Sequence, residues 1–234
     1  MRNRVQMTLV ACIASLGLLS VVTPSRAQVP PTASEIAAYQ GLHRAVASGD
    51  LNALNAVLAT KPDLEARDGR GRTALHIAAH ASAYDKVRAL VAAGANVRAL
   101  DSQRYDIITI AAVKDDVAMV DLAISLGGDP KAITSLYDGT ALIAAAHLGH
   151  DGVIRSLIKA GAPLDHVNNL TWTAVIEAIV LGDGGPRHQA SLKALVEAGA
   201  KISIPDKAGV MPLQMAEQRG YTAMVQILKS APRR

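Results

Sequence analysis

A short phrase of small and aliphatic residues returns along this chain at a nearly constant interval, and this repetition restricts the possible folds more than any other feature. Its clearest copy reads TALHIAA at residues 73–79. Counting weaker copies at both ends, the phrase opens at Gln40, Thr73, Asp106, Thr140, Thr173 and Met211. The successive openings lie 33, 33, 34, 33 and 38 residues apart. A period near 33 predicts an array of stacked repeats rather than a single globular core.

A second marker keeps the same phase, because pairs of small residues open at Gly94, Gly127, Gly161 and Gly199. Between the two markers each unit reads as a helix, a turn, a second helix and a loop. In the second unit Thr73 is placed to cap the first helix, and Gly94 supplies the left-handed residue that ends the second. The predicted units lie near residues 35–66, 67–99, 100–133, 134–167, 168–205 and 206–230.

The composition indicates how such units would pack. The chain has no Phe and only 3% aromatic residues, so its core must be aliphatic. Alanine pairs such as Ala78-Ala79 let neighbouring helices approach closely, while leucines and valines of adjacent units interleave. No unit buries its apolar face alone, so stability arises at the interfaces between units.

The phrase and its period resemble the ankyrin repeat, whose signature is Thr-Pro-Leu-His-x-Ala, followed by a Gly-His turn and a Leu-Leu-x-x-Gly-Ala ending. The closest matches are residues 71–79, 148–150 and 157–162, and the resemblance covers residues 35–230. The signature His is present at His76 and replaced in most other units. The resemblance implies an all-α ankyrin-repeat solenoid of about six stacked helix-turn-helix units with short hairpin-like loops. It implies little about activity.

Residues 1–27 are predicted to be a signal peptide. Arg2 and Arg4 precede a mostly apolar stretch at residues 5–22, and Ser25 and Ala27 are the small residues of a cleavage site after Ala27. The predicted location is therefore the periplasm or the exterior, with no stable membrane anchor after cleavage. A retained transmembrane anchor and lipoprotein processing at Cys12 remain open alternatives.

The ends of the mature chain differ from the repeats. Residues 28–34 are predicted to be a linker, after which Thr32 and Glu35 form a capping box. The helix that this box opens is expected to run through Leu42 and Val46. Residues 231–234 form a basic tail. In the fifth unit residues 182–188 are expected to stretch the turn between the helices, as a surface insertion rather than a functional loop.

Charge and cysteine content exclude several functions. The whole chain has 24 basic and 20 acidic residues, and removal of the signal peptide takes away three arginines, leaving a net charge near +1. This balance does not favour nucleic acid as a partner, because nucleic-acid binding needs a concentrated basic surface. The single cysteine, Cys12, leaves with the signal peptide, which excludes thiol catalysis and cysteine–zinc sites in the mature chain.

No catalytic, cofactor-binding or metal-binding residues are predicted. The resemblance gives His76 and His150 structural roles, and His80 and His147 lie two units apart, too far to share an ion. The chain lacks the His-Glu-x-x-His, phosphate-loop, Gly-x-Ser-x-Gly and dinucleotide-binding sequences.

The loops between units carry the candidate binding residues. In ankyrin proteins these loops form fingers that, with the exposed side of each first helix, line a concave groove. The side chains placed there by the repeat phase are Arg70, Arg72, Tyr105, Tyr137 and Trp172 on fingers, and His80, Val113, His147, Leu148, Val180 and Leu181 on first helices. Aromatic side chains beside aliphatic ones, with charges around them, are typical of protein-binding surfaces. The alternative is that the aromatic rings pack locally against their own loops.

The sequence thus favours a non-catalytic module that binds a periplasmic protein partner through the groove, as a scaffold or accessory factor. An inhibitor or immunity protein that blocks a toxin or an enzyme is the alternative. A metal-dependent or hydrolytic enzyme is a distant third. The identity of the partner and the oligomeric state are not predicted.

Overall fold

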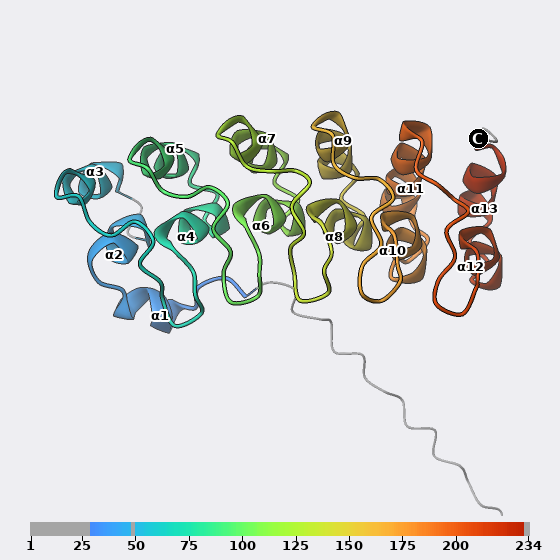
Figure 1. Ribbon diagram of the computed structural model, residues 1–234, viewed down its shortest axis with the longest axis horizontal. Helices are drawn as coiled ribbons and strands as arrows, with labels where there is room; N and C mark the ends of the chain where they lie inside the picture. The colour runs from blue at the N-terminus through green and yellow to red at the C-terminus, as the bar shows by residue number, and fades with distance from the viewer. Residues whose placement is uncertain (1–28, 48–49, 232–234) are drawn as a thin grey trace, which may run out of the picture.

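The computed structural model describes residues 29–47 and 50–231, and within these ranges the regular secondary structure is α-helical, with loops and turns between the helices. A short helix, α1 (Ala33–Ala38), precedes six helix pairs that stack side by side into an elongated array (Figure 1). The first helices of the pairs are α2 (Gly41–Ala47), α4 (Ala74–His80), α6 (Ile107–Val113), α8 (Ala141–Leu148), α10 (Ala174–Val180) and α12 (Pro212–Gln218). The second helices are α3 (Leu51–Ala59), α5 (Tyr84–Ala92), α7 (Val117–Ser125), α9 (Asp151–Lys159), α11 (Pro186–Ala198) and α13 (Thr222–Lys229). The predicted solenoid of six units is confirmed.

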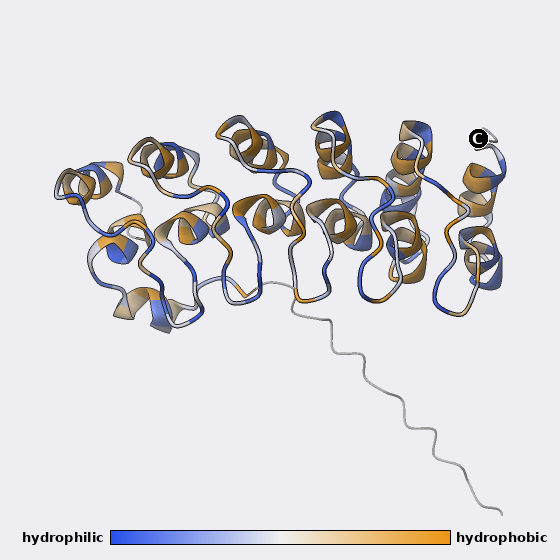
Figure 2. Ribbon diagram, in the orientation of Figure 1, coloured by the Kyte–Doolittle hydropathy of each residue, from blue (hydrophilic) through white to orange (hydrophobic). Residues whose placement is uncertain are grey.

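Small side chains determine how the first helices stack. Each first helix packs against the next along the row from α2 to α12. Ala78, Ala111 and Ala145 at equivalent positions of these helices are fully buried. The second helices bury one face only, as α9 does with Val153 and Leu157. Figure 2 shows the hydrophobic helix faces turned towards one another and hydrophilic residues concentrated in the loops.

A polar residue five positions before the signature opening stabilises the finger in each of the second to sixth units. In the second unit Asp68 Oδ1 accepts hydrogen bonds from the backbone N–H groups of Arg70 and Arg72, both at 2.9 Å. A short Asp or Asn side chain can satisfy turn N–H groups in this way, which closes the loop. The residues that accept such bonds are Asp68, Asp101, Ser135, Asn168 and Asp206.

Two histidines connect neighbouring units, as the ankyrin resemblance implies. His76 Nδ1 accepts a hydrogen bond from the backbone N–H of Thr73, and His76 Nε2 lies 3.1 Å from the carbonyl oxygen of Tyr105 in the next finger. His150 Nδ1 lies 2.8 Å from the carbonyl oxygen of Ala112 in the preceding unit. Both imidazoles therefore contribute to contacts between neighbouring units.

The first unit differs from its prediction. The capping box of Thr32 and Glu35 is present, but α1 begins at Ala33, so the end of the predicted linker is helical. The single helix expected through Val46 is interrupted, because Tyr39 is extended and Gly41 has a φ of +51° that only glycine adopts readily. Predictions for residues 1–27 lie outside the described residues, as do those for 232–234 of the tail.

The prediction for residues 182–188 is wrong in part. Residues 186–188 form the first turn of α11, which has 13 residues where α5, α7 and α9 each have nine. Pro186 at the first position of this helix fits the fixed φ of proline. The insertion packs against its neighbours, since His188 Nε2 lies 3.0 Å from the carbonyl oxygen of His147 and the Tyr221 hydroxyl donates to the Gly182 carbonyl. In the two described ranges no helix is both long and apolar enough to cross a bilayer.

Candidate functional site

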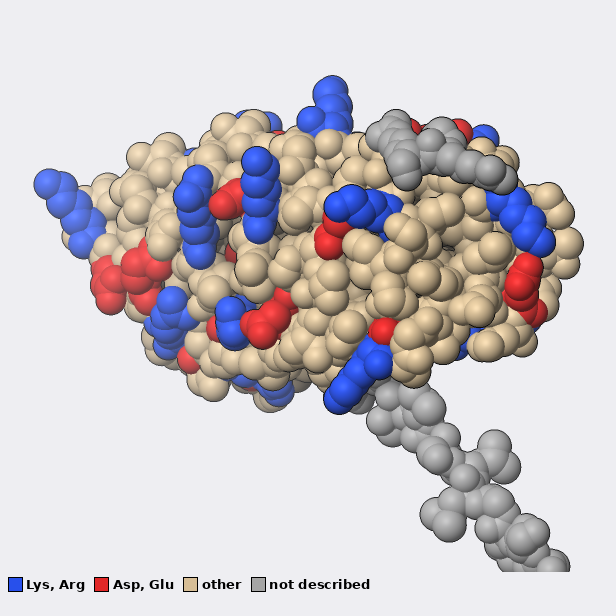
Figure 3. Space-filling model, turned by 45° about the vertical axis from the view of Figure 1, so that its right-hand side comes forward, with Lys and Arg blue, Asp and Glu red and all other residues tan. Residues whose placement is uncertain are grey.

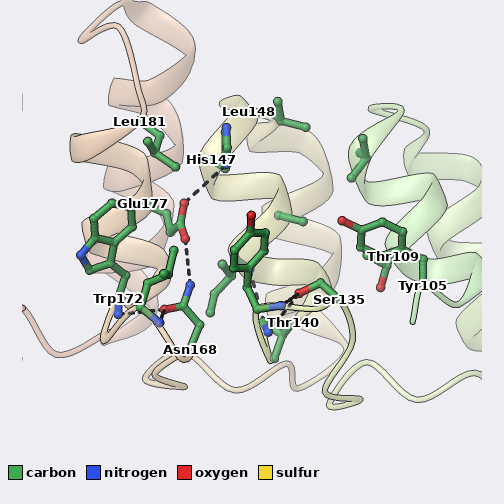
Figure 4. A pocket seen from close by; sticks show the side chains of 16 residues that line it. Tyr105, Thr109, Ser135, Thr140, His147, Leu148, Asn168, Trp172, Glu177 and Leu181 are labelled. Carbon is green, nitrogen blue, oxygen red and sulfur yellow. Dashed lines mark hydrogen bonds and ion pairs between the residues drawn. The ribbon is translucent and has the colours of Figure 1, made fainter. Parts of the chain in front are cut away.

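A cavity of about 540 Å³ lies along the first helices α6, α8 and α10 and the fingers that precede them. Figure 4 shows the side chains of both parts pointing into a common space. The finger residues that line it are Tyr105, Ser135, Tyr137, Gly139, Asn168, Leu170 and Trp172. The helix-side residues are Thr109, Val113, Thr140, Ile143, Ala144, His147, Leu148, Glu177 and Leu181. The cavity therefore spans three repeats at the middle of the array.

Most of the predicted binding residues come together in this cavity. Seven of the eleven line it, namely Tyr105, Val113, Tyr137, His147, Leu148, Trp172 and Leu181. The repeat phase places them there because each finger residue and each helix end recur on the same side of every unit.

The three aromatic side chains are not equally available to a partner. Tyr137 is 50% exposed, so its ring stands at the opening of the cavity. Tyr105 is only 8% exposed and belongs to the core, which corrects its prediction as an exposed finger residue. Trp172 is partly buried and packs against the core while it lines the cavity. Tyr105 is thus packed locally within the core. Tyr137, and Trp172 in part, are available for contact with a partner.

Glu177 of α10 lies at the inner wall of the cavity, and the sequence prediction missed it. Its side chain is only 5% exposed. Oε1 accepts a hydrogen bond of 2.9 Å from the side-chain amide of Asn168, while Oε2 is buried and has no hydrogen-bond partner among the described residues. His147 Nδ1 lies 3.5 Å from Oε2 (Figure 4).

Asn168 holds the carboxylate in place. Its side-chain oxygen accepts from the backbone N–H groups of Leu170 at 3.0 Å and Trp172 at 2.9 Å, which closes the finger. Its amide nitrogen is therefore oriented towards Glu177. The ordinary finger residue, aspartate, could not donate this bond, because an ionised carboxylate only accepts.

The two titratable groups of this wall have shifted pKa values. Burial raises the pKa of Glu177 to about 7, against the opposing effect of the Asn168 hydrogen bond. Burial lowers the pKa of His147, and electrostatic repulsion from the neighbouring His188 acts in the same direction. His147 is therefore neutral near pH 7, while Glu177 titrates there.

The repeat pattern of the sequence indicates that Glu177 and Asn168 are unusual. The fourth residue after the five openings from Thr73 onward is Ile77, Ile110, Ala144, Glu177 or Met215, and the weaker first copy has Arg44 there. A carboxylate at a position that is apolar in the second, third, fourth and sixth units, together with Asn168 where other fingers have aspartate or serine, marks the fifth unit as chemically different.

Arg72 has a structural role, which corrects its prediction as a binding residue. It is 1% exposed and pairs with Asp68 at 2.7 Å and with Glu35 at 3.1 Å. Its other contacts are the hydroxyl of Tyr39 and the backbone carbonyl of Val29. Burial alone would raise the pKa of Asp68, but hydrogen bonds from Tyr39 and Arg72 hold it below its usual value. Arg72 thus fastens the N-terminal helix to the second unit.

A smaller cavity of about 180 Å³ lies beside this cluster and holds the remaining basic candidates. Arg70, Arg72 and His80 line it. Arg70 is exposed but pairs with Glu35 at 2.8 Å. Burial and the positive charges of Arg72 and Lys114 lower the pKa of His80 to about 4, so it is uncharged at neutral pH. Val180, the last predicted residue, lines neither cavity.

The described residues offer little for metal chemistry. They contain no group of three or more His, Cys, Asp or Glu side chains that could hold an ion. On the face drawn in Figure 3, basic and acidic side chains are interspersed, with wide uncharged areas between them.

Comparison with known proteins identifies the fold as that of ankyrin repeat proteins. The family model described as "Ankyrin repeats (3 copies)" matches residues 42–134 and 108–206. The putative ankyrin repeat protein YahD of Escherichia coli (strain K12) is 31% identical over 188 residues, which cover 80% of this chain and 93% of that protein. A solved ankyrin repeat domain from Acinetobacter baumannii AYE is similar with a TM-score of 0.77 and 39% sequence identity, over 81% of this chain and 96% of that chain. The solved ankyrin repeat protein EF0377 has a TM-score of 0.77 at 28% identity, over 83% of this chain and 100% of that chain.

Proposed function

The chain belongs to the ankyrin repeat family, and we propose that it binds a periplasmic protein partner through its concave groove, as a scaffold or accessory factor that catalyses no reaction. Ankyrin repeats are protein–protein interaction modules, and the fold is generally a non-catalytic scaffold. The groove of this proposal consists of the 540 Å³ cavity and the fingers around it.

The observation that carries the proposal is the presence of exposed apolar side chains at the cavity and on the two fingers beside it. Tyr137 and Leu170 are exposed and line the cavity, while Ile133, Leu136 and Val167 are exposed on the same two fingers outside its lining. Leu181 is exposed on the helix side of the same cavity. Exposed apolar side chains gathered around a cavity are typical of an interaction site. A rigid aromatic such as Tyr137 supplies contact area at low entropic cost, as binding anchors do.

The location follows from the predicted signal peptide. Cleavage after Ala27 would release a mature chain that begins at Gln28 and folds in the periplasm or outside the cell. The near-neutral charge of this mature chain favours a partner recognised by apolar contact over one recognised by long-range attraction.

Site-directed photo-crosslinking in the native host tests the proposal. A photoreactive amino acid replaces Tyr137 at the cavity in one variant, and in the matched control it replaces Tyr84, which is 37% exposed on α5 and does not line the cavity. We expect one prominent crosslinked protein in the periplasmic fraction from position 137 and none from position 84. Equal crosslinking from both positions, or crosslinks in the cytoplasmic fraction only, would refute the proposed function.

A further inference from the structure

We propose that the cavity receives a lysine side chain of the protein partner, whose ammonium group pairs with Glu177 at the inner wall. The inference rests on the proposed function, because it specifies the chemistry by which the groove would recognise its partner. It also explains a feature that the fold itself does not need, a carboxylate at a repeat position that is apolar in the second, third, fourth and sixth units.

The buried carboxylate oxygen Oε2 of Glu177 lacks a hydrogen-bond donor within the described part of the chain. Oε2 has no hydrogen-bond partner among the described residues, although its side chain is only 5% exposed. A buried carboxylate without a full set of partners is unfavourable, and a donor brought by a ligand would satisfy it. Glu177 is placed on the cavity wall (Figure 4), so such a donor would arrive from the groove and reach Oε2 when the side chains that enclose this oxygen, among them His147, move aside.

The walls fit the stem of a lysine side chain. Val113, Ile143 and Leu148 provide aliphatic surface along the helices, and Tyr137 and Trp172 provide rings on the finger side. Lysine buries its methylene groups against apolar surface while its ammonium group needs polar partners. The aromatic rings would also attract the cation when it passes over their faces.

Lysine fits the carboxylate better than arginine does. A guanidinium group forms its strongest pair by donating two parallel bonds to both oxygens of a carboxylate. Here Oε1 is already bonded to the Asn168 amide, which leaves only Oε2. A compact ammonium group can use one oxygen, and a second of its protons can reach His147 Nδ1, which lies 3.5 Å from Oε2.

The size of the cavity indicates how the lysine would be presented. A volume of about 540 Å³ is in the range of pockets that take an entire drug-sized ligand. It therefore has room for a lysine together with the apolar residues on either side of it. An extended segment with aliphatic residues flanking the lysine would cover Leu170 and Leu181 at the rim.

Synthetic peptides test the inference directly on the purified protein. Three peptides share the sequence acetyl-Ala-Leu-X-Leu-Ala-amide, where X is lysine, norleucine or arginine. Norleucine keeps the aliphatic stem and lacks the ammonium group. Trp172 is the only tryptophan of the chain and lines the cavity, so its fluorescence reports binding at this site.

Two glutamate variants provide the contrast. Glu177→Gln keeps the shape and the acceptor for Asn168 but removes the charge. Glu197→Gln makes the same chemical change at an exposed position of α11 that does not line the cavity. Melting curves establish that both variants fold before binding is compared.

We expect the wild type and Glu197→Gln to bind the lysine peptide about tenfold more tightly than the norleucine peptide, as for one charge-assisted hydrogen bond. In Glu177→Gln this preference should disappear. Equal binding of lysine and norleucine peptides by the wild type, or an unchanged preference in folded Glu177→Gln, would overturn the inference. An arginine peptide that binds more tightly than the lysine peptide would overturn the choice of lysine.

The two proposals can fail separately. If position 137 crosslinks a partner while the wild type does not distinguish the peptides, the groove binds a protein by other contacts and the lysine inference is wrong. If the lysine preference depends on Glu177 but position 137 crosslinks nothing, the site has the stated chemistry and the proposed function is wrong.

Discussion

Glu177→Gln should stabilise the protein at alkaline pH, because it removes a carboxylate that is costly to ionise in the folded state. The pKa of Glu177 is raised by burial from 4.5 to about 7. An acid with a raised pKa holds its proton in the folded state at pH values where the unfolded chain has lost it. Stability therefore falls as pH rises from about 4.5 to about 7, and the full cost applies above that window.

The magnitude follows from the size of the shift. Each pKa unit corresponds to about 1.4 kcal/mol, so a change from 4.5 to about 7 amounts to roughly 3 kcal/mol at pH 8. Glutamine keeps the acceptor for the Asn168 amide and places an uncharged N–H₂ group where Oε2 now lies. The free energy of unfolding of Glu177→Gln should thus exceed that of the wild type by about 3 kcal/mol at pH 8, and by less than about 1 kcal/mol at pH 5.

Urea unfolding at pH 5 and pH 8 measures both differences. His147 titrates in both proteins, so most of its contribution cancels in the comparison. Thermal melting at pH 8 should show an increase of about 6–12 °C for an array of this length. Glu197→Gln, at an exposed position, is the control and should change little. If Glu177→Gln lowers stability, or raises it equally at both pH values, the carboxylate is not a strained buried acid and our description of the wall is wrong.

Three further predictions concern the stack and its processing. Arg72→Ala should lower the free energy of unfolding by about 3–5 kcal/mol in urea titrations, because Asp68 then stays buried without its cation. Arg70→Ala, which removes an exposed ion pair, should lower it by at most about 1 kcal/mol. Leu157→Ala removes a fully buried side chain from the second-helix row and should cost about 2–5 kcal/mol in the same assay, a result that an exposed Leu157 would not give. Intact-mass measurement of protein from an exporting host should find a chain that begins at Gln28, and a retained Met1 or a lipid on Cys12 would contradict the predicted cleavage.

The architecture was predictable because it depends on recurring positions. The alanines and the finger residues return every 33 or 34 residues in most units, so two helices and a turn can be read from any one copy. The break between α1 and α2 was not predictable in this way, because the first unit has no complete copy to compare. Pro186 likewise begins a helix within residues 182–188, which the prediction of a stretched turn over all seven residues did not reveal.

The candidate site could be predicted where the position of a residue in the repeat determines its location. It could not be predicted where the role of a residue depends on contacts between side chains. The repeat phase correctly brought Tyr137, Leu148 and Leu181 to one cavity. The phase could not show that Arg72 folds inward, because its partner Glu35 comes from the N-terminal helix, outside the repeats. The importance of Glu177 depends on burial and on the orientation of Asn168, which are properties of the folded chain.

The affinity for the crosslinked partner tests the central claim, that the cavity and its fingers are the binding surface. The purified partner is titrated against the wild type, Tyr137→Ala and the control Tyr84→Ala, after melting curves show that all three are folded. We predict that Tyr137→Ala weakens binding by about 2 kcal/mol, roughly thirtyfold, as expected for an aromatic anchor, and that Tyr84→Ala binds as the wild type does. Wild-type affinity in Tyr137→Ala, or an equal loss in Tyr84→Ala, would contradict the claim.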